Sequence, residues 1–206
     1  SLEERGKLIS NFAEKISEKK EELAQLLTME QGKPLNFARA ELDMAVHWCR
    51  EIAKYNLKSE VIEETDQYIV EKTYSPVGVV AAIVPWNFPI LLTMFKVPAA
   101  LLAGNTIIVK PSPYTPLGTL LLGELAQEFF PPGVFNVLSG DDDLGPWITE
   151  HPNIDKVSFT GSSATGKKVM QSAAGNLKRV TLELGGNDAA IVLPDVNPKE
   201  VAPKLF

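Results

Sequence analysis

The chain has 206 residues, with 26 acidic side chains, 20 Lys and Arg, and a formal net charge of −6. This acidic balance gives no reason to expect a nucleic-acid partner or an anionic membrane surface. The single cysteine, Cys49, excludes a disulfide framework and a cysteine-based metal site, and no other metal site is expected. No signal segment opens the sequence and no apolar run is long enough to span a membrane, so the expected setting is the cytoplasm.

Two helices are predicted first. Apolar residues at three- and four-residue steps predict an amphipathic helix over residues 8–27, which Gln31-Gly32-Lys33-Pro34 brings to an end. The next helix carries an apolar stripe at Ala38, Leu42, Ala45, Cys49 and Ile52. An apolar helix face keeps a thiol protonated, so Cys49 is interpreted as a core residue rather than a nucleophile. His47 lies off the stripe and is expected at the surface.

Strands and helices then alternate. A run of β-formers at 67–74 predicts an exposed strand, and 79–84 a buried one. Further strands are expected at 106–110, 134–138, 156–159 and 179–184, with helices at 90–102, 116–129, 145–150 and 164–173. Thr115 is the expected N-cap of the helix that starts at Pro116. This order predicts an α/β fold with a doubly wound parallel sheet, a Rossmann-like cofactor domain that binds ligands at the carboxyl ends of its strands.

Two strand ends carry side chains suited to catalysis. Glu183 stands in the run Thr181-Leu182-Glu183-Leu184-Gly185-Gly186, where burial could raise the pKa of its carboxyl group and make it a general base. The alternative is an ordinary Glu on the solvent face of the strand. Asn87, within Pro85-Trp86-Asn87-Phe88-Pro89, could donate an N–H to an oxyanion. A purely structural turn explains that segment equally well.

The other strand ends suggest phosphate binding. Gly161 to Lys167 imitates a P-loop, but Lys168 stands where the magnesium-binding Ser or Thr is needed, so a P-loop nucleotidase is disfavoured. A helix start that binds the phosphates of a dinucleotide fits better, although the glycine spacing is not G-x-G-x-x-G. A plain βα turn is the alternative. Lys110, in Val109-Lys110-Pro111-Ser112, could meet a ribose or phosphate, or could be a surface lysine.

These motifs, in this order, resemble the aldehyde dehydrogenase superfamily, and Glu30-Gln31-Gly32-Lys33-Pro34 extends the resemblance towards the start of the chain. The resemblance implies oxidation of an aldehyde to a carboxylic acid with NAD or NADP through a cysteine thioester. Asn87 matches the oxyanion-binding residue and Glu183 the base that activates water, which fits the acid-producing branch. The cofactor positions implied are Val84, Pro85, Trp86, Lys110, Ser112, Gly140, Gly161, Ser162 and Leu184.

The resemblance also implies a division of the chain. Residues 1–186 correspond to the cofactor-binding domain, interrupted at about 64–77 by a hairpin that serves oligomerisation, so a homodimer or homotetramer is expected. Residues 187–206 correspond to the start of the catalytic domain.

Two departures from the family pattern matter. Pro113 replaces a Glu that binds the ribose hydroxyls in NAD-preferring members, so NADP becomes acceptable. The nucleophilic cysteine is missing, because Cys49 lies far upstream in another context. The chain is therefore expected to be an N-terminal fragment that is inactive alone. A non-catalytic dinucleotide-binding or interaction module is the alternative, and the class of aldehyde stays open.

Overall fold

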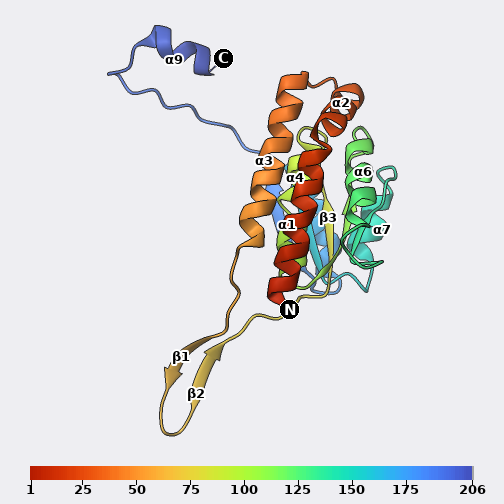
Figure 1. Cartoon of the computed structure of the whole chain (residues 1–206), viewed down its shortest axis with the longest axis vertical. Helices are drawn as coiled ribbons and strands as arrows, with labels where there is room; N and C mark the ends of the chain where they lie inside the picture. The colour runs from red at the N-terminus through yellow and green to blue at the C-terminus, as the bar shows by residue number, and fades with distance from the viewer. Residues whose placement is uncertain (206) are drawn as a thin grey trace.

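In a computed structural model that describes residues 1–205, the chain begins with a helical layer followed by an exposed hairpin. Figure 1 shows the hairpin projecting away from the body of the molecule. These elements are α1 (Leu2–Glu18), α2 (Lys20–Gln31), α3 (Leu35–Ala53), β1 (Glu60–Glu64) and β2 (Ile69–Lys72).

Strands and helices alternate through the rest of the chain. They are β3 (Val79–Ile83), α4 (Pro89–Met94), α5 (Val97–Leu102), β4 (Thr106–Lys110), α6 (Leu117–Ala126), β5 (Phe135–Val137), α7 (Leu144–Glu150), β6 (Lys156–Gly161), α8 (Ser163–Ala174), β7 (Arg179–Leu184) and α9 (Pro198–Leu205). The strand predicted over residues 179–184 has the same bounds in the structure.

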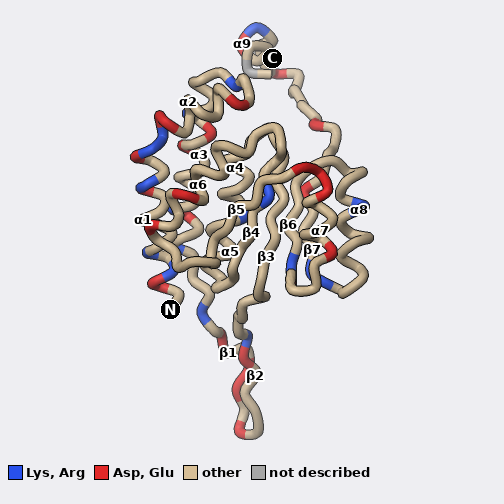
Figure 2. The backbone as a smooth tube through the Cα atoms, turned by 90° about the vertical axis from the view of Figure 1, so that its right-hand side faces the viewer, with Lys and Arg blue, Asp and Glu red and all other residues tan. Residues whose placement is uncertain are grey.

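The five strands β3 to β7 form one parallel sheet in the order β5-β4-β3-β6-β7, which Figure 2 shows edge to edge. The predicted doubly wound α/β fold is therefore confirmed. The chain first adds β4 and β5 on one side of β3, and then returns to add β6 and β7 on the other. This reversal places the carboxyl ends of β3 and β6 next to each other, with Ile83 paired to Phe159. Such a switch point is where doubly wound folds bind ligands.

The sheet has a separate apolar core on each face. Val80, Ala82 and Val84 pack under helices α1 to α6, together with Ile107 and Val109 of β4. On the other face Ala81, Val157 and Phe159 pack against Ile148 of α7 and Val169 of α8. Alternate residues of β3 thus serve both cores, which is why its sequence is continuously apolar.

Two helices predicted as single elements are each broken in two. The helix predicted over residues 8–27 is interrupted at Lys19, and the break lets Ile16 of α1 and Leu23 of α2 both enter the core beside α3. The helix predicted over 90–102 is divided between α4 and α5. Pro98 explains this second break, because it has no N–H to donate to the carbonyl of Met94.

The predicted N-cap of α6 is also wrong. The hydroxyl of Thr115 is buried and has no hydrogen-bond partner among the described residues. The carboxylate of Glu30, at the end of α2, accepts the N–H groups of Leu117 at 2.7 Å and Gly118 at 3.1 Å instead. A helix start can be satisfied by a distant side chain as well as by its neighbour, and local sequence does not show which.

The hairpin starts earlier than the expected residue 64. Glu60 pairs with Lys72 and Glu64 with Ile69, and every residue of both strands is exposed. The first strand was missed because three of its five residues are Glu, which is a poor strand former. After β7 an exposed segment without regular structure leads to α9, which Figure 1 shows apart from the sheet.

Candidate functional site

A groove of about 760 Å³ lies over the carboxyl ends of β3, β4 and β6, at the switch point of the sheet. Seven of the nine positions implied for a cofactor line it: Val84, Pro85, Trp86, Lys110, Ser112, Gly161 and Ser162. We call this hollow the cofactor groove. The sequence thus predicted side chains that the fold brings together from three separate strands.

Lys110 is the buried cation of the cofactor groove. It closes β4 and is only 5% exposed. Burial lowers the pKa of its ammonium group, while the charges of Asp142 and Asp141 partly oppose that effect. Asp142 and Asp143 line the same groove and were not singled out from the sequence. The cofactor groove therefore contains the positive charge of Lys110 and the negative charges of two aspartates.

The start of α8 forms another wall of the cofactor groove. Ser162 is its N-cap, and the Ser162 hydroxyl accepts the N–H of Thr165 at 3.1 Å. A Cβ at Gly161 would lie 2.6 Å from the ring of Phe159, and one at Gly166 would lie 2.4 Å from Leu184 Cδ2. Gly166 therefore permits close packing between α8 and β7, which is one role of glycine in dinucleotide-binding turns, whereas Gly161 makes room for the ring of Phe159 in its own strand.

A second groove, of about 1100 Å³, contains Asn87, Glu183 and Leu184. We call it the catalytic groove. It shares Pro85, Trp86, Gly161 and Ser162 with the cofactor groove, so the two hollows meet along these residues. The residues implied for catalysis and those implied for the cofactor are therefore brought to adjoining spaces.

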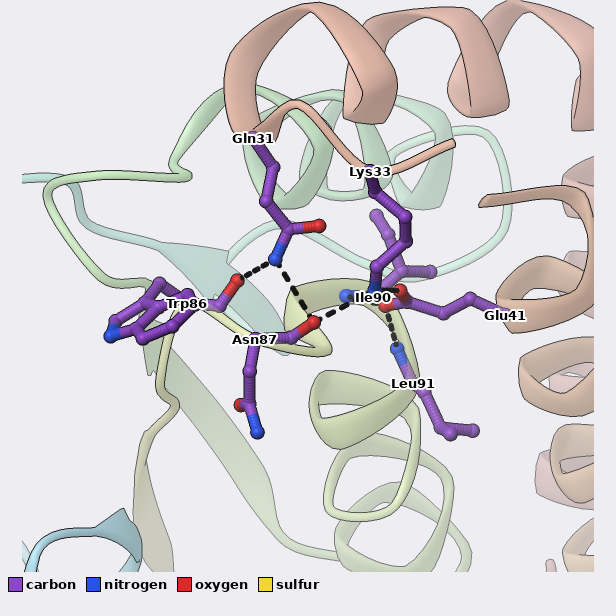
Figure 3. Close-up of polar contacts among 7 residues, drawn as sticks. All are labelled: Gln31, Lys33, Glu41, Trp86, Asn87, Ile90 and Leu91. Carbon is purple, nitrogen blue, oxygen red and sulfur yellow. Dashed lines mark hydrogen bonds and ion pairs between the residues drawn. The ribbon is translucent and has the colours of Figure 1, made fainter. Parts of the chain in front are cut away.

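The side chain of Asn87 is exposed and makes no hydrogen bond to any residue in the described part of the chain. Its main-chain carbonyl, in contrast, accepts the Nε2–H of Gln31 at 2.9 Å and the Nζ–H of Lys33 at 2.7 Å. Figure 3 shows the Asn87 side chain pointing away from these donors. The loop is held through its backbone, and the amide is left free to donate to a ligand.

Glu183 is exposed, contrary to the burial considered from its apolar run. The reason is its position on β7, the edge strand of the sheet, where Arg179 and Thr181 on the same face are exposed as well. The carboxylate faces the catalytic groove rather than an apolar interior. The structure therefore shows the exposure expected of a Glu on an open strand face, and the same exposure leaves the carboxylate accessible from the groove.

Lys96, between α4 and α5, is a charged residue of the catalytic groove that the sequence did not indicate. Its Nζ donates to the hydroxyls of Ser158 at 3.2 Å and Thr160 at 2.8 Å. Burial lowers the pKa of the Lys96 ammonium, and the charge of Glu183 partly restores it. Lys96 lies in a helical region far from any strand end in sequence, so no motif marked it.

Gly140 lies in neither groove. A Cβ there would meet Leu144 of α7 at 2.8 Å, so this glycine serves the packing of α7.

Cys49 is fully buried, burial raises the pKa of its thiol to about 12, and its Sγ–H points to the carbonyl of Ile9 at 3.7 Å. It is a core residue, as predicted.

Residues 1–205 contain no helix long and apolar enough to cross a membrane. They also contain no group of three or more His, Cys, Asp or Glu side chains placed to hold a metal ion.

The parallel sheet, its switch-point groove and the glycine-bearing start of α8 define a dinucleotide-binding α/β protein. The model of the aldehyde dehydrogenase family matches residues 1–206, so the chain belongs to that family.

Solved structures agree with this assignment. The chain superposes with a TM-score of 0.95 on the NAD⁺ complex of aldehyde dehydrogenase from Bacillus cereus, at 39% identity over 98% of this chain and 42% of that one. An NADP-dependent enzyme of E. coli gives a TM-score of 0.88, at 38% identity over 91% of this chain and 40% of that one. NAD and NADP are thus both found among the neighbours.

A curated relative, aldehyde dehydrogenase LUC3 of a Fusarium species, is 44% identical over 205 residues. The match takes in 100% of this chain and 43% of the relative. The chain therefore spans less than half the length of the proteins that it matches.

Proposed function

We propose that this chain supplies the cofactor-binding half of an NAD(P)-dependent aldehyde dehydrogenase that converts an aldehyde, with water, to a carboxylic acid. The observation that carries the proposal is the meeting of the two grooves at Pro85, Trp86, Gly161 and Ser162. One groove offers a cation and a helix start, and the other offers an amide donor and a carboxylate. Oxidation followed by hydrolysis needs both sets of groups side by side.

The cofactor groove fits a dinucleotide. The start of α8, where Gly161 and the N-cap Ser162 both line the groove, suits a pyrophosphate. Lys110 suits the adenosine ribose or its phosphate, and Trp86, 56% exposed where the grooves meet, suits a flat ring. The nicotinamide, when bound, supplies the oxidant that takes hydrogen with its electron pair from the substrate carbon.

Asn87 binds the substrate oxygen in this proposal. Attack on an aldehyde carbonyl by a thiolate puts negative charge on that oxygen, and a fixed N–H donor stabilises the charge. The side-chain amide of Asn87 is exposed to the catalytic groove and unused by the rest of the described chain, while its backbone is fixed. The thiolate comes from beyond this chain, because the pKa of Cys49 is about 12 and its thiol is buried.

Glu183 takes a proton from the water that releases the acid. A carboxylate in the same groove as Asn87 can hold and deprotonate that water. The positive charge of Lys96 is close enough to interact with the Glu183 carboxylate. Glu183 then releases this proton to bulk solvent.

The test uses the complete gene product that contains this chain, with NAD or NADP and a series of short aldehydes. Reduced cofactor is followed by its absorbance, in the steady state and in the first turnover. Glu183→Gln should slow the steady state by about a hundredfold or more while leaving a first-turnover burst, since only the hydrolytic step needs the base. Glu3→Gln, an exposed change on α1, is the matched control.

Three outcomes decide the proposal. A full-speed steady state in Glu183→Gln would remove this residue from the mechanism. Binding of NAD or NADP without turnover of any aldehyde would favour a non-catalytic dinucleotide-binding module. The isolated 206-residue chain should bind cofactor without oxidising aldehydes, and thiol-dependent turnover that Cys49→Ser abolishes would contradict this expectation.

We also propose that the β1–β2 hairpin joins copies of the protein. Val61, Ile62, Ile69 and Val70 are each between 44% and 58% exposed. A two-stranded hairpin is only marginally stable alone, so a covering partner would stabilise it. Light scattering should show Ile62→Lys shifting the complete protein to smaller species, and an unchanged mass would count against the hairpin.

A further inference from the structure

The segment from Gln31 to Lys33 lies against the loop that carries Asn87. Gln31 Nε2 donates to the carbonyls of both Trp86 and Asn87, the latter at 2.9 Å. Lys33 Nζ donates to the carbonyl of Asn87 at 2.7 Å (Figure 3). Two side chains from the end of the second helix therefore converge on one peptide group, which lies beyond the last residue of β3.

Lys33 is itself held by a buried carboxylate. Its Nζ forms an ion pair with Glu41 of α3, and the two side chains are 11% and 0% exposed. The other oxygen of Glu41 accepts the N–H groups of Ile90 at 2.9 Å and Leu91 at 3.1 Å, in the first turn of α4. The carboxylate thus joins Lys33 to the helix that follows the Asn87 loop.

The same ammonium group lies 3.9 Å from the centre of the Phe88 ring. Lys33 therefore contacts Glu41, the Asn87 carbonyl and the next residue along the loop at once. The loop is fixed before Asn87 through Trp86, at Asn87 itself, and after it through Phe88, Ile90 and Leu91.

We infer that Gln31, Lys33 and Glu41 are positioning residues that aim the Asn87 amide at the substrate oxygen. The inference rests on the proposed function. Among the described residues, every hydrogen bond made to Asn87 is accepted by its carbonyl, while its side chain points the opposite way into the catalytic groove. Gln31 holds the carbonyls of both Trp86 and Asn87, so the peptide planes on either side of the Asn87 Cα are fixed. Together they set the direction of the Cα–Cβ bond and leave both amide hydrogens available.

The three residues differ in how far each one also stabilises the fold. Glu41 without Lys33 would be an unpaired charge at 0% exposure, which is strongly destabilising. Gln31 is different, because it is neutral and half-buried, and its Oε1 has no partner among the described residues. Removing its amide deletes the two bonds to the loop and little else, so Gln31→Leu isolates the positioning effect from the fold.

Two variants and one control test the inference in the complete gene product. Gln31→Leu removes the neutral donor. The double variant Lys33→Met with Glu41→Gln removes the cation, and leaves an amide oxygen to accept the N–H groups of Ile90 and Leu91. Lys20→Met is the control, because it deletes another ion pair between α2 and α3, the exposed contact of 2.6 Å with Asp43. Circular dichroism and urea unfolding confirm that each variant is folded.

The first readout is steady-state oxidation of propanal with NAD. Both test variants should lose about tenfold to a hundredfold in kcat, since a misplaced catalytic group costs this much. Their KM for NAD should change less than their kcat does, because Lys110 and the start of α8 make no hydrogen bond with the three altered residues in the described part of the chain. Lys20→Met should match the unaltered protein in both constants. A kcat within about twofold of the unaltered protein in both folded variants would overturn the inference.

The second readout does not depend on turnover. Hydrogen exchange of peptides covering residues 84–92 should be faster in both test variants than in the Lys20→Met control. Equal protection in all forms would show that the cluster does not hold the loop, and would overturn the inference by itself. Failure of the unaltered protein to oxidise any aldehyde would instead sink the proposed function, while the exchange measurement still decides whether these three residues position the loop.

Discussion

Gly166 offers a sharp test of how closely α8 must approach β7. An ideal Cβ at this position would lie 2.4 Å from Leu184 Cδ2 and 3.1 Å from its Cδ1. Carbon atoms in ordinary contact are about 3.5–4.0 Å apart, so the end of Leu184 would have to move by roughly 1.1–1.6 Å. Leu184 follows Glu183 directly and lines the catalytic groove, so this movement occurs inside the candidate site.

Gly166→Ala should therefore change the site more than the stability. Leu184 is 42% exposed, so its side chain can turn aside. Leaving its present rotamer costs about 0.5–1.5 kcal/mol. The helix gains up to about 1 kcal/mol when Ala replaces Gly. The free energy of unfolding should change by less than about 1 kcal/mol, whereas the branched side chain of Gly166→Val should lower it by about 1–3 kcal/mol.

Urea unfolding measures the stability. Titration with NAD, followed by intrinsic tryptophan fluorescence to which Trp86 contributes, measures cofactor binding. Gly166→Ala should weaken binding about threefold to tenfold, or about 1 kcal/mol. Gly175→Ala is the control, because a Cβ there would meet nothing closer than 3.5 Å. A loss of more than about 2 kcal/mol of stability in Gly166→Ala would refute the reasoning, since it would mean that backbone, not the Leu184 side chain, opposes the added methyl group.

Three further expectations concern the charged side chains of Glu30, Lys110 and Asp142. Glu30→Ala should lower the free energy of unfolding, measured with urea at pH 8, by about 1–2 kcal/mol, because the N–H groups at the start of α6 lose their cap. Glu30→Gln should lower it by less than about 1 kcal/mol, because burial raises the pKa of the Glu30 carboxyl and a neutral amide avoids that cost of burial. Burial lowers the pKa of Lys110, and the side chain is charged below that pKa and neutral above it, so cofactor affinity should fall with rising pH before the ordinary lysine pKa of 10.5 is reached. Calorimetric titration should show this fall in the unaltered protein and no such fall in Lys110→Arg, whose side chain stays charged. Asp142→Asn should raise affinity for NADP relative to NAD by about fivefold in competitive binding, since a carboxylate in the groove repels an added phosphate.

The sheet was predictable from the sequence because its strands are continuously apolar runs between turn residues. Strand β7 was placed at its observed bounds, and the order of strands and helices followed from their alternation. Most strand-end side chains were predictable for the same reason, since a parallel sheet carries all its carboxyl ends to one edge. Asn87 and Lys110 were identified as candidate site residues from the sequence alone.

Contacts that join distant segments were not predictable. Glu41 looks in sequence like one more charge on an amphipathic helix, yet it is fully buried and bonded to the start of α4. Lys96 lies in an apolar helical stretch and shows no motif. Glu183 was the opposite case, because its apolar neighbours suggested burial, whereas an edge strand leaves it exposed. Burial of a charged residue depends on what packs over it, and a local pattern cannot contain that information.

The helical layer before the sheet acquires a function from these contacts. Loops at the carboxyl ends of parallel strands have no ladder bonds, so something outside the sheet must fix them if they are to hold reacting groups. Glu30 fixes the start of α6, and Gln31 and Lys33 fix the Asn87 loop, all from four consecutive residues. Because Glu41 is fully buried, separating it from Lys33 would leave an uncompensated charge that costs about 3–5 kcal/mol. The attachment is therefore stiff, and the segment between α2 and α3 governs the geometry of a site that is formed by residues far along the chain.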